Sequence, residues 1–377
     1  MIYLDHNATT ALRPGVLAAM QPWFEQHYGN ANSQHRAGRL ARQAVEQARA
    51  QVAALVHCEA AEVFFTSGST ESINWALRGL CPDAPRLVGS TDHEAVLETL
   101  PHCERLAVDQ AGRPDLRSLK AWLQEHPRAL VSVMAANNET GVLANLAEIS
   151  AVVKSADGLL HTDATQMCGR LPVDFRHAEL AAMSVSAHKL GGPKGVGALI
   201  LRRGQEILAI QRGGKHEQGL RAGTLNVPGI VGFAAACEHA QAHMAEEALR
   251  HAQWRDAFEQ ELCKRHPQAE IFGLEAKRLP NTSFFALPGW HSEALLMALD
   301  KAGFALASGS ACTSGTDVPS HVLTAMGVPA QRALGAVRMS LGHNSLESDL
   351  PALLDALDAI VKPVSQGGAA FAGLLNQ

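Results

Sequence analysis

The sequence predicts an α/β protein whose mostly parallel sheet is covered by helices on both faces, together with a smaller α+β domain. Short apolar runs of strand length alternate with helical patterns through the first half of the chain. From about residue 232 the pattern becomes one long helix, followed by a strand-like segment at 281–287. The strands predicted for the main sheet are 62–67, 86–90, 129–136, 158–163, 181–188 and 195–201.

The helical patterns lie before and between these strands. Residues 37–56 predict a surface helix, and residues 71–80 and 147–156 fill two of the gaps between strands. The long helix covers 232–266, and a loop rich in glycine and serine follows at 308–315. The apolar face predicted for the first helix consists of Leu40, Ala44, Val45, Ala48, Val52 and Leu55.

Composition limits the classes of function. The chain has 377 residues, 47% of them apolar, which is enough to build the cores of two domains. Its net charge is −5 and its Lys and Arg residues form no stripe, which argues against direct nucleic-acid or membrane binding. The first ten residues lack the pattern of a secretion signal, so we expect a cytoplasmic protein. The seven cysteines are scattered, with no Cys-x-x-Cys pair, so we expect reduced thiols and no metal site.

Polar side chains occur where the predicted strands stop. Residues 66–72, "TSGSTES", follow a strand and open a helix, so Ser69, Thr70 and free helix N–H groups can form an anion cup. The same pattern is equally typical of an ordinary helix N-cap. Asp163 ends another strand, where a carboxylate often only caps a turn.

Lys189 follows the strand at 181–188 and precedes a glycine-rich segment, "LGGPKGVG", that leaves room for a bulky ligand. Taken alone it could be a solvated surface lysine. An anion cup, an aspartate and a lysine together match a ligand with a phosphate, a basic ring nitrogen and a carbonyl, and pyridoxal phosphate has all three. Lys189 would then form a Schiff base with the carbonyl, and Ser186 and His188 would donate to the phosphate.

Three further polar residues are candidates for the same site. His93 follows the strand at 86–90 and is either a solvated loop histidine or a ring-stacking group that moves protons near neutral pH. Asn138 and Gln166 are either turn residues or neutral hydrogen-bonding partners of the ring oxygen.

Ten segments, in order, resemble the cysteine desulfurases of the class V aminotransferase group, in particular the NifS/IscS-like branch. They are "YLDHNATT", "GNANSQHRAG", "FTSGSTESIN", "STDHEAVLET", "NNETGV", "HTDATQ", "SAHKLGGPKGVGAL", "HEQGLRAGTLNV", "SGSACTSG" and "VRMSLG". The resemblance covers nearly the whole chain and implies the fold type I of pyridoxal phosphate enzymes, with a seven-stranded sheet between helices. It places the large domain at 13–245 and the small domain at 1–12 and 246–377, with a mobile cysteine loop at about 308–318.

The resemblance also assigns the site residues. It implies that Lys189 binds pyridoxal phosphate covalently and that His93 stacks on the ring and moves protons. Arg338 would bind the α-carboxylate of L-cysteine, a task that suits the planar guanidinium, although an ion pair is its ordinary role. Thr224 would reach the phosphate from a second subunit, so a homodimer is implied. The other implied contacts are Ser69, Thr70, Asn138, Asp163, Gln166, Ser186 and His188 for the cofactor, and Asn30 and Asn138 for the substrate.

Cys312 distinguishes this family from plain transaminases. Its neighbours in "ASGSACTSG" are small and polar, which is typical of a solvent-reaching loop, whereas the other six cysteines fit small buried positions. The implied reaction removes sulfur from L-cysteine, leaves L-alanine, and stores the sulfur as a persulfide on Cys312. An acceptor protein of unknown identity would then take the sulfur toward iron–sulfur clusters or thio-modification.

Two alternatives stay open at this stage. The same cofactor apparatus suits a selenocysteine lyase or another β-lyase, and the fold also suits a non-catalytic sulfur carrier or regulator. The chain departs from the usual family pattern at Ala31, Lys215, Gln218 and His343.

Overall fold

A computed structural model describes residues 1–309 and 318–361 of the chain. Cys312 and most of the glycine- and serine-rich loop therefore lie outside the described residues. Within them the predicted α/β architecture is confirmed, because the main sheet has seven strands in the order β2-β8-β7-β6-β5-β3-β4. These strands are β2 (Val63–Thr66), β3 (Arg86–Gly89), β4 (Glu104–Leu106), β5 (Leu130–Ser132), β6 (Leu159–Asp163), β7 (Ala182–Ser186) and β8 (Gly197–Leu201).

The main sheet is parallel except at β8, which runs antiparallel to both of its neighbours, β2 and β7. All six predicted strands are present. The seventh, β4, was not predicted because it lies at the edge of the sheet and has two exposed residues out of three, so it forms no apolar run.

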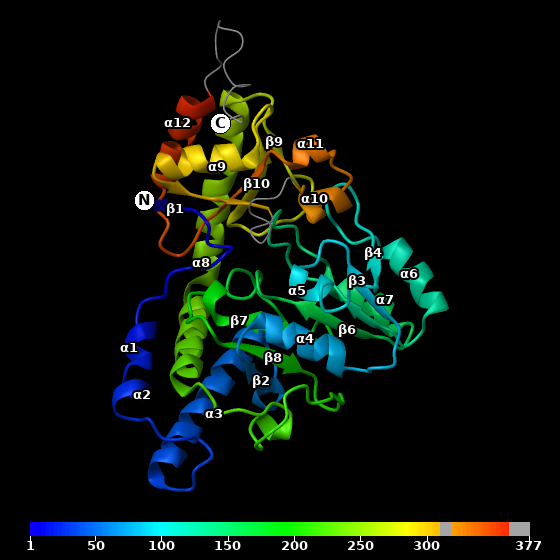
Figure 1. Cartoon of the computed structure of the whole chain (residues 1–377), viewed down its shortest axis with the longest axis vertical. Coiled ribbons are helices and arrows are strands. Elements are labelled where there is room, and N and C mark those ends of the chain that lie inside the picture. The colour runs from blue at the N-terminus through cyan, green and yellow to red at the C-terminus, as the bar shows by residue number, and fades with distance from the viewer. Residues whose placement is uncertain (310–317, 362–377) are drawn as a thin grey trace, which may run out of the picture.

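Helices cover both faces of the main sheet (Figure 1). Successive strand residues point to opposite faces, so Phe65 packs in one hydrophobic core and Phe64 in the other. Leu40 was predicted on the buried face of the first long helix but is 40% exposed, because the buried stripe is shifted by one residue to Ala41. The helices that lead into this sheet region or pack on it are α1 (Val16–Met20), α2 (Pro22–Glu25), α3 (Arg36–Val56), α4 (Ser69–Gly79), α5 (Glu94–Leu97), α6 (Leu116–Glu125), α7 (Leu146–Lys154) and α8 (Val227–Arg265).

A smaller antiparallel sheet, in the order β12-β13-β10-β9, lies above the main sheet in Figure 1. The N-terminal strand pairs beside it in a separate two-stranded ladder, β1 with β11. The elements of this part are β1 (Ile2–Tyr3), β9 (Glu270–Ile271), β10 (Thr282–Ala286), β11 (Phe304–Ala305), β12 (Ala307–Ser308), β13 (Ala336–Ser340), α9 (Ser292–Lys301), α10 (His321–Ala325), α11 (Ala330–Ala333) and α12 (Asp349–Val361).

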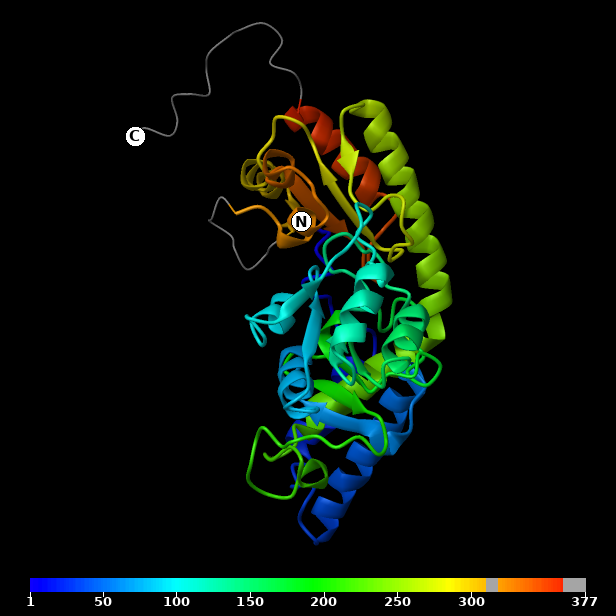
Figure 2. The same ribbon diagram turned by 90° about the vertical axis from the view of Figure 1, so that its right-hand side faces the viewer.

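Helix α8 runs along both sheets (Figure 2). Its first turns pack in the core of the main sheet through Phe233 and Cys237, and its last turns pack in the small-sheet core through Phe258 and Leu262. The predicted boundary after residue 245 falls between these two stretches, where most residues from 241 to 250 are exposed or half-buried. The division into two domains stays a prediction.

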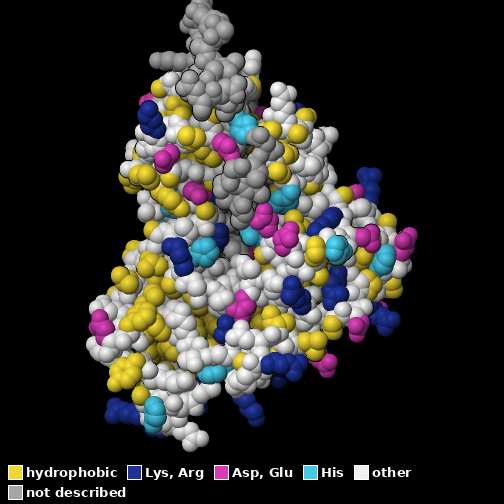
Figure 3. All heavy atoms as spheres, viewed as in Figure 1, with side chains coloured by type: hydrophobic (Ala, Val, Ile, Leu, Met, Phe, Trp, Pro, Cys, Tyr) yellow, Lys and Arg dark blue, Asp and Glu magenta, His cyan; other side chains and the backbone are white. Residues whose placement is uncertain are grey.

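The parallel strands bring their carboxyl ends to one edge of the main sheet, which is where ligands of such sheets bind. The ends of β2, β3, β5, β6 and β7 lead to the polar segments that the sequence analysis singled out. Within the described part of the chain, no helix is long and apolar enough to cross a membrane. The face in Figure 3 carries acidic and basic side chains intermixed, with no stripe of one sign.

Candidate active site

Lys189 ends a short 3-10 turn, Ala187–Lys189, that directly follows β7. Its Nζ donates to two backbone carbonyl oxygens of the N-terminal segment, Asn7 at 2.6 Å and Ala8 at 2.8 Å. Burial lowers the pKa of this amine to about 7, and the positive charges of Arg170 and Arg338 contribute to the same shift. A substantial fraction of the amine is therefore neutral, and so nucleophilic, near neutral pH.

The side chain of Lys189 borders a cleft with a cavity volume of about 210 Å³. Five predicted site residues line it together: His93, Asn138, Gln166, Lys189 and Arg338. Six residues that were not assigned beforehand complete the lining: Asn7, Ala8, Glu94, Glu139, Gly309 and His321.

His93 is the N-cap residue of α5, and its Nδ1 accepts a hydrogen bond of 3.0 Å from the Ala95 amide. The proton of the neutral ring therefore lies on Nε2. Burial and the charge of Lys189 lower the pKa of His93, whereas Asp163 opposes this shift. Asp163 is 5% exposed at the end of β6, and its Oδ1 accepts from the Thr165 amide at 2.9 Å.

The predicted anion cup lies at the start of α4. Its N-cap residue, Gly68, makes no side-chain capping hydrogen bond, so the first amides of the helix are not satisfied by a cap. A Cβ at Gly197 of β8 would lie 2.7 Å from Gly68 Cα, so only glycine allows this close approach. Ser69 is half-buried and Thr70 is exposed at this helix start, and Ser186 is buried at the end of the neighbouring β7.

His188 follows Ser186 by two residues, and its Nδ1 lies 3.2 Å from Thr9 Oγ1. Burial lowers the pKa of His188 to about 4, so the ring is neutral at pH 7. A neutral ring that is hydrogen-bonded at one nitrogen keeps its other nitrogen for a further partner.

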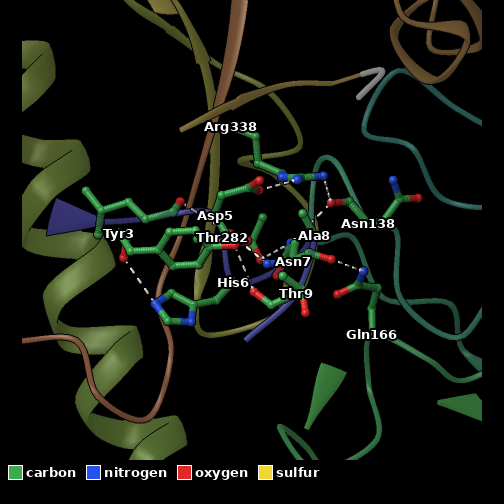
Figure 4. A network of polar contacts seen from close by, with 12 residues as sticks. Tyr3, Asp5, His6, Asn7, Ala8, Thr9, Asn138, Gln166, Thr282 and Arg338 are labelled. Carbon is green, nitrogen blue, oxygen red and sulfur yellow. Dashed lines mark hydrogen bonds and ion pairs between the residues drawn. The ribbon is translucent and has the colours of Figure 1, made fainter. Parts of the chain in front are cut away.

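Arg338 reaches the cleft from β13 and is 3% exposed (Figure 4). It forms an ion pair of 2.6 Å with Asp5 Oδ1 and donates to the Asn138 carbonyl at 3.0 Å. Its Nε and the Asn138 side-chain Oδ1 are buried and have no hydrogen-bond partner within the described residues. Two buried polar atoms without partners beside a cleft indicate that a ligand completes the site.

The backbone of Asn7 connects the two sides of the cleft. Its carbonyl accepts from Gln166 Nε2 at 3.0 Å (Figure 4). The same carbonyl accepts from Lys189 Nζ. The side chain of Asn7 donates to the Asn138 carbonyl at 3.1 Å. Asp5 and Asn7 were not predicted as site residues, although both lie in "YLDHNATT", where polar residues directly follow a short strand.

The remaining predicted residues do not line this cleft. Asp163, Ser69, Thr70, Ser186 and His188 lie at the strand ends and the helix start described above, and three others lie elsewhere or outside the described residues. Asn30 is exposed, and its Oδ1 accepts from the Asn32 amide at 2.9 Å in a local turn. Thr224 is exposed in the segment between β8 and α8. Cys312 lies outside the described residues. Their roles stay predictions.

Residues 1–309 and 318–361 contain no group of three or more His, Cys, Asp or Glu side chains that could hold a metal ion. The site is instead an edge of a doubly covered sheet, where the Lys189 amine and the Arg338 guanidinium line one cleft. These features define an α/β protein that binds a small polar ligand at the strand ends.

Residues 2–353 match the family model described as aminotransferase class-V. A cysteine desulfurase of Sinorhizobium fredii (strain NBRC 101917 / NGR234) is 42% identical over 385 positions, with 99% of each chain covered. A solved structure described as a NifS-like protein is 35% identical and has a TM-score of 0.88, over 96% of this chain and 99% of that one. A structure of SspA in complex with cysteine is 28% identical and has a TM-score of 0.78, over 90% and 99%. The chain belongs to the class-V aminotransferase family, and the resemblance inferred from the ten segments is confirmed.

Proposed function

We propose that the protein is a cysteine desulfurase that converts L-cysteine to L-alanine and stores the released sulfur as a persulfide on Cys312. The observation that carries the proposal is the cleft itself, in which the reactive amine of Lys189 and the guanidinium of Arg338 face one cavity. The relative from Sinorhizobium fredii is named a cysteine desulfurase, and its similarity to this chain extends over 99% of both chains.

The described residues fit pyridoxal phosphate as the cofactor. Bound there, the cofactor supplies an aldehyde that reacts with amines and a ring that withdraws electrons from an attached amino acid. Lys189 would hold the aldehyde carbon and Asp163 the ring nitrogen. The uncapped start of α4, with Ser69, Thr70, Ser186 and His188, would hold the phosphate, because free helix amides favour an anion.

The polar contacts of the cleft assign further roles. The unpartnered Arg338 Nε and Asn138 Oδ1 are the groups that meet the substrate, with Arg338 binding its α-carboxylate. The Nε2 proton of His93 is available to the cofactor or the substrate, because Nδ1 is held by the Ala95 amide. Lys189 would accept the α-proton of the amino acid, because its amine borders the same cleft and its pKa is lowered to about 7. Gln166 would donate to the ring oxygen.

Transfer of the sulfur atom requires only one cysteine side chain of the protein. L-cysteine and the Cys312 thiol together give L-alanine and a Cys312 persulfide, so the Cβ–S bond breaks, an S–S bond forms, and no external oxidant is required. The chain enters the segment that contains Cys312 directly from Gly309, which lines the cleft. An acceptor protein would then remove the outer sulfur.

We propose a homodimer in which Thr224 of one subunit contacts the phosphate of the other. Exposed apolar side chains over α1, α2 and their flanks, namely Leu12, Leu17, Phe24 and Tyr28, support a surface for self-association. Sedimentation at micromolar concentration tests the dimer, and a monomer that retains bound cofactor would contradict the role of Thr224. The cytoplasmic location and the iron–sulfur or thio-modification pathway stay predictions.

The decisive experiment incubates the purified protein with L-cysteine and measures L-alanine and protein-bound persulfide. Wild type should form both, whereas Cys312→Ala should lose the persulfide and keep the visible absorbance of bound cofactor. Cys263, like Cys81, is exposed, although a buried position was predicted for both, so Cys263→Ala is the matched control and should behave as wild type. Persulfide formation that survives in Cys312→Ala would overturn the assignment.

The same assay separates the alternatives. A preference for selenocysteine over cysteine would indicate a selenocysteine lyase, and binding of cofactor without turnover of either substrate would indicate a carrier or regulator.

A further inference from the structure

Arg170 lies in the turns that follow β6 and shares a second, smaller cavity with Lys189. Four of its hydrogen bonds go to uncharged oxygens. Its Nη1 donates to the Gln166 carbonyl at 2.8 Å and to Gln166 Oε1, and its Nη2 donates to the carbonyls of His6 at 3.0 Å and Lys189 at 3.4 Å. Arg170 forms no ion pair within the part of the chain that the structure describes.

These contacts determine which way the Gln166 amide points. A guanidinium only donates hydrogen bonds, so the side-chain atom of Gln166 that it contacts must be the oxygen. The NH₂ group of Gln166 then faces away from Arg170, where it donates to the Asn7 carbonyl at 3.0 Å at the edge of the cleft. Gln166 therefore presents its hydrogen-bond donor, the NH₂ group, to the cleft.

We propose that Arg170 is a positioning residue of this site: it turns the donor end of Gln166 toward the cleft and places an uncompensated positive charge behind Lys189. The proposal rests on the proposed function only in taking Lys189 as the lysine that binds the cofactor. Nothing in the sequence marks Arg170 as part of the site, because it lies outside every strand end.

The charged groups around Lys189 show why it matters that Arg170 has no acidic partner among the described residues. Arg170, Arg338 and the two flanking histidines, His93 and His188, interact with the amine from different elements, and Asp163 and Asp5 oppose the two arginines. Asp5 is itself engaged by Arg338, whereas Arg170 has no acid partner among the described residues. After burial, Arg170 is the largest influence that lowers the pKa of Lys189 to about 7. Removing its charge should let the amine hold its proton to higher pH.

The test measures the reactivity of the Lys189 amine directly. The full-length chain, freed of cofactor, is labelled briefly with acetic anhydride at a series of pH values, and the labelling of Lys189 is quantified by mass spectrometry. The exposed Lys194 in the same segment is the internal reference. The wild-type midpoint should lie near pH 7, that of Arg170→Gln should rise by about 1 pH unit or more, and Arg170→Lys should stay near wild type.

A midpoint near pH 7 in Arg170→Gln, or equal shifts in Arg170→Gln and Arg170→Lys, would overturn the proposal. Arg170→Met, an uncharged side chain of similar length, replaces Arg170→Gln if the latter does not fold. Labelling needs no turnover, so a protein that forms no alanine from L-cysteine would contradict the proposed function, while the labelling midpoints would still support or refute the role of Arg170. As a second readout, the visible absorbance of bound cofactor should move in Arg170→Gln, because the Gln166 amide is no longer held in one orientation.

Discussion

The two sides of the cleft differ in whether their charged side chains have ion-pair partners. On the small-sheet side, Arg338 pairs with Asp5 at 2.6 Å. On the main-sheet side, Lys189, Arg170 and Asp92 form no ion pair within the described residues. A buried charge with a partner keeps its charge, whereas a buried amine or carboxyl without one moves toward its neutral form, and an arginine stays charged in either case. The small-sheet side is therefore suited to binding an anion, and the main-sheet side to proton transfer and covalent chemistry.

The largest effect expected from this contrast is at the amine of Lys189, which forms no ion pair within the described residues. Lys189→Ala should lower alanine formation by at least about 10³-fold, because no other amine of the described cleft can replace the nucleophile. Alanine release and the visible absorbance of bound cofactor are measured, with the exposed Lys194→Ala as the matched control. Activity above a tenth of wild type in Lys189→Ala would show that the main-sheet side does not carry the chemistry.

A smaller effect is expected on the small-sheet side, where Arg338 pairs with Asp5. Arg338→Ala should lower kcat/KM for L-cysteine by about 100-fold, the loss expected for one charged contact with the substrate. Asp5→Asn, which keeps Arg338 but removes its partner, should lower it by about 10-fold, chiefly through KM. Steady-state kinetics measure both, with the exposed Arg332→Ala as control. An equal loss in Asp5→Asn and Arg338→Ala would mean that the ion pair itself, and not the guanidinium, is required.

The smallest effect concerns stability. Burial raises the pKa of Asp92 from 3.8 to about 8, and its Oδ2 has no hydrogen-bond partner within the described residues. Between these values the folded protein holds a proton that the unfolded chain has released, so the contribution of Asp92 to stability falls as pH rises toward 8. Asp92→Asn should remove this loss, so the free energy of unfolding of the variant relative to wild type should rise steadily from pH 4 to pH 8.

Thermal and urea unfolding at several pH values, read by circular dichroism, measure this difference. Asp83→Asn, at an exposed position, is the control. If Asp92→Asn destabilises the protein equally at every pH, the carboxyl of Asp92 is charged and partnered, and the contrast between the two sides of the cleft is wrong.

Much of the main-sheet side was predictable from the sequence. Strand ends are visible as the points where apolar runs stop, and the carboxyl ends of parallel strands meet at one edge whatever the rest of the fold does. This argument singled out Asp163 and Lys189, although each alone was also open to an ordinary role, and only their combination with the predicted anion cup indicated a cofactor site that also includes Ser186. The helix face at residues 37–56 was displaced by one position at Leu40, because helical periodicity locates a stripe only to within a residue or so.

What the sequence by itself determined is therefore local: the strands, the residues that end them, and the family to which its motifs belong. Only the tertiary structure decided which charges have partners. Arg338 and Asp5 are separated by 333 positions, and they meet because the N-terminal segment docks between the two sheets. Arg170 lies seven residues after Asp163, yet its guanidinium turns toward carbonyl oxygens and not toward that carboxylate. Periodicity and chain turns act over a few residues and leave a pattern in the sequence, whereas the pairing of buried charges depends on how distant segments pack, which no short stretch of sequence records.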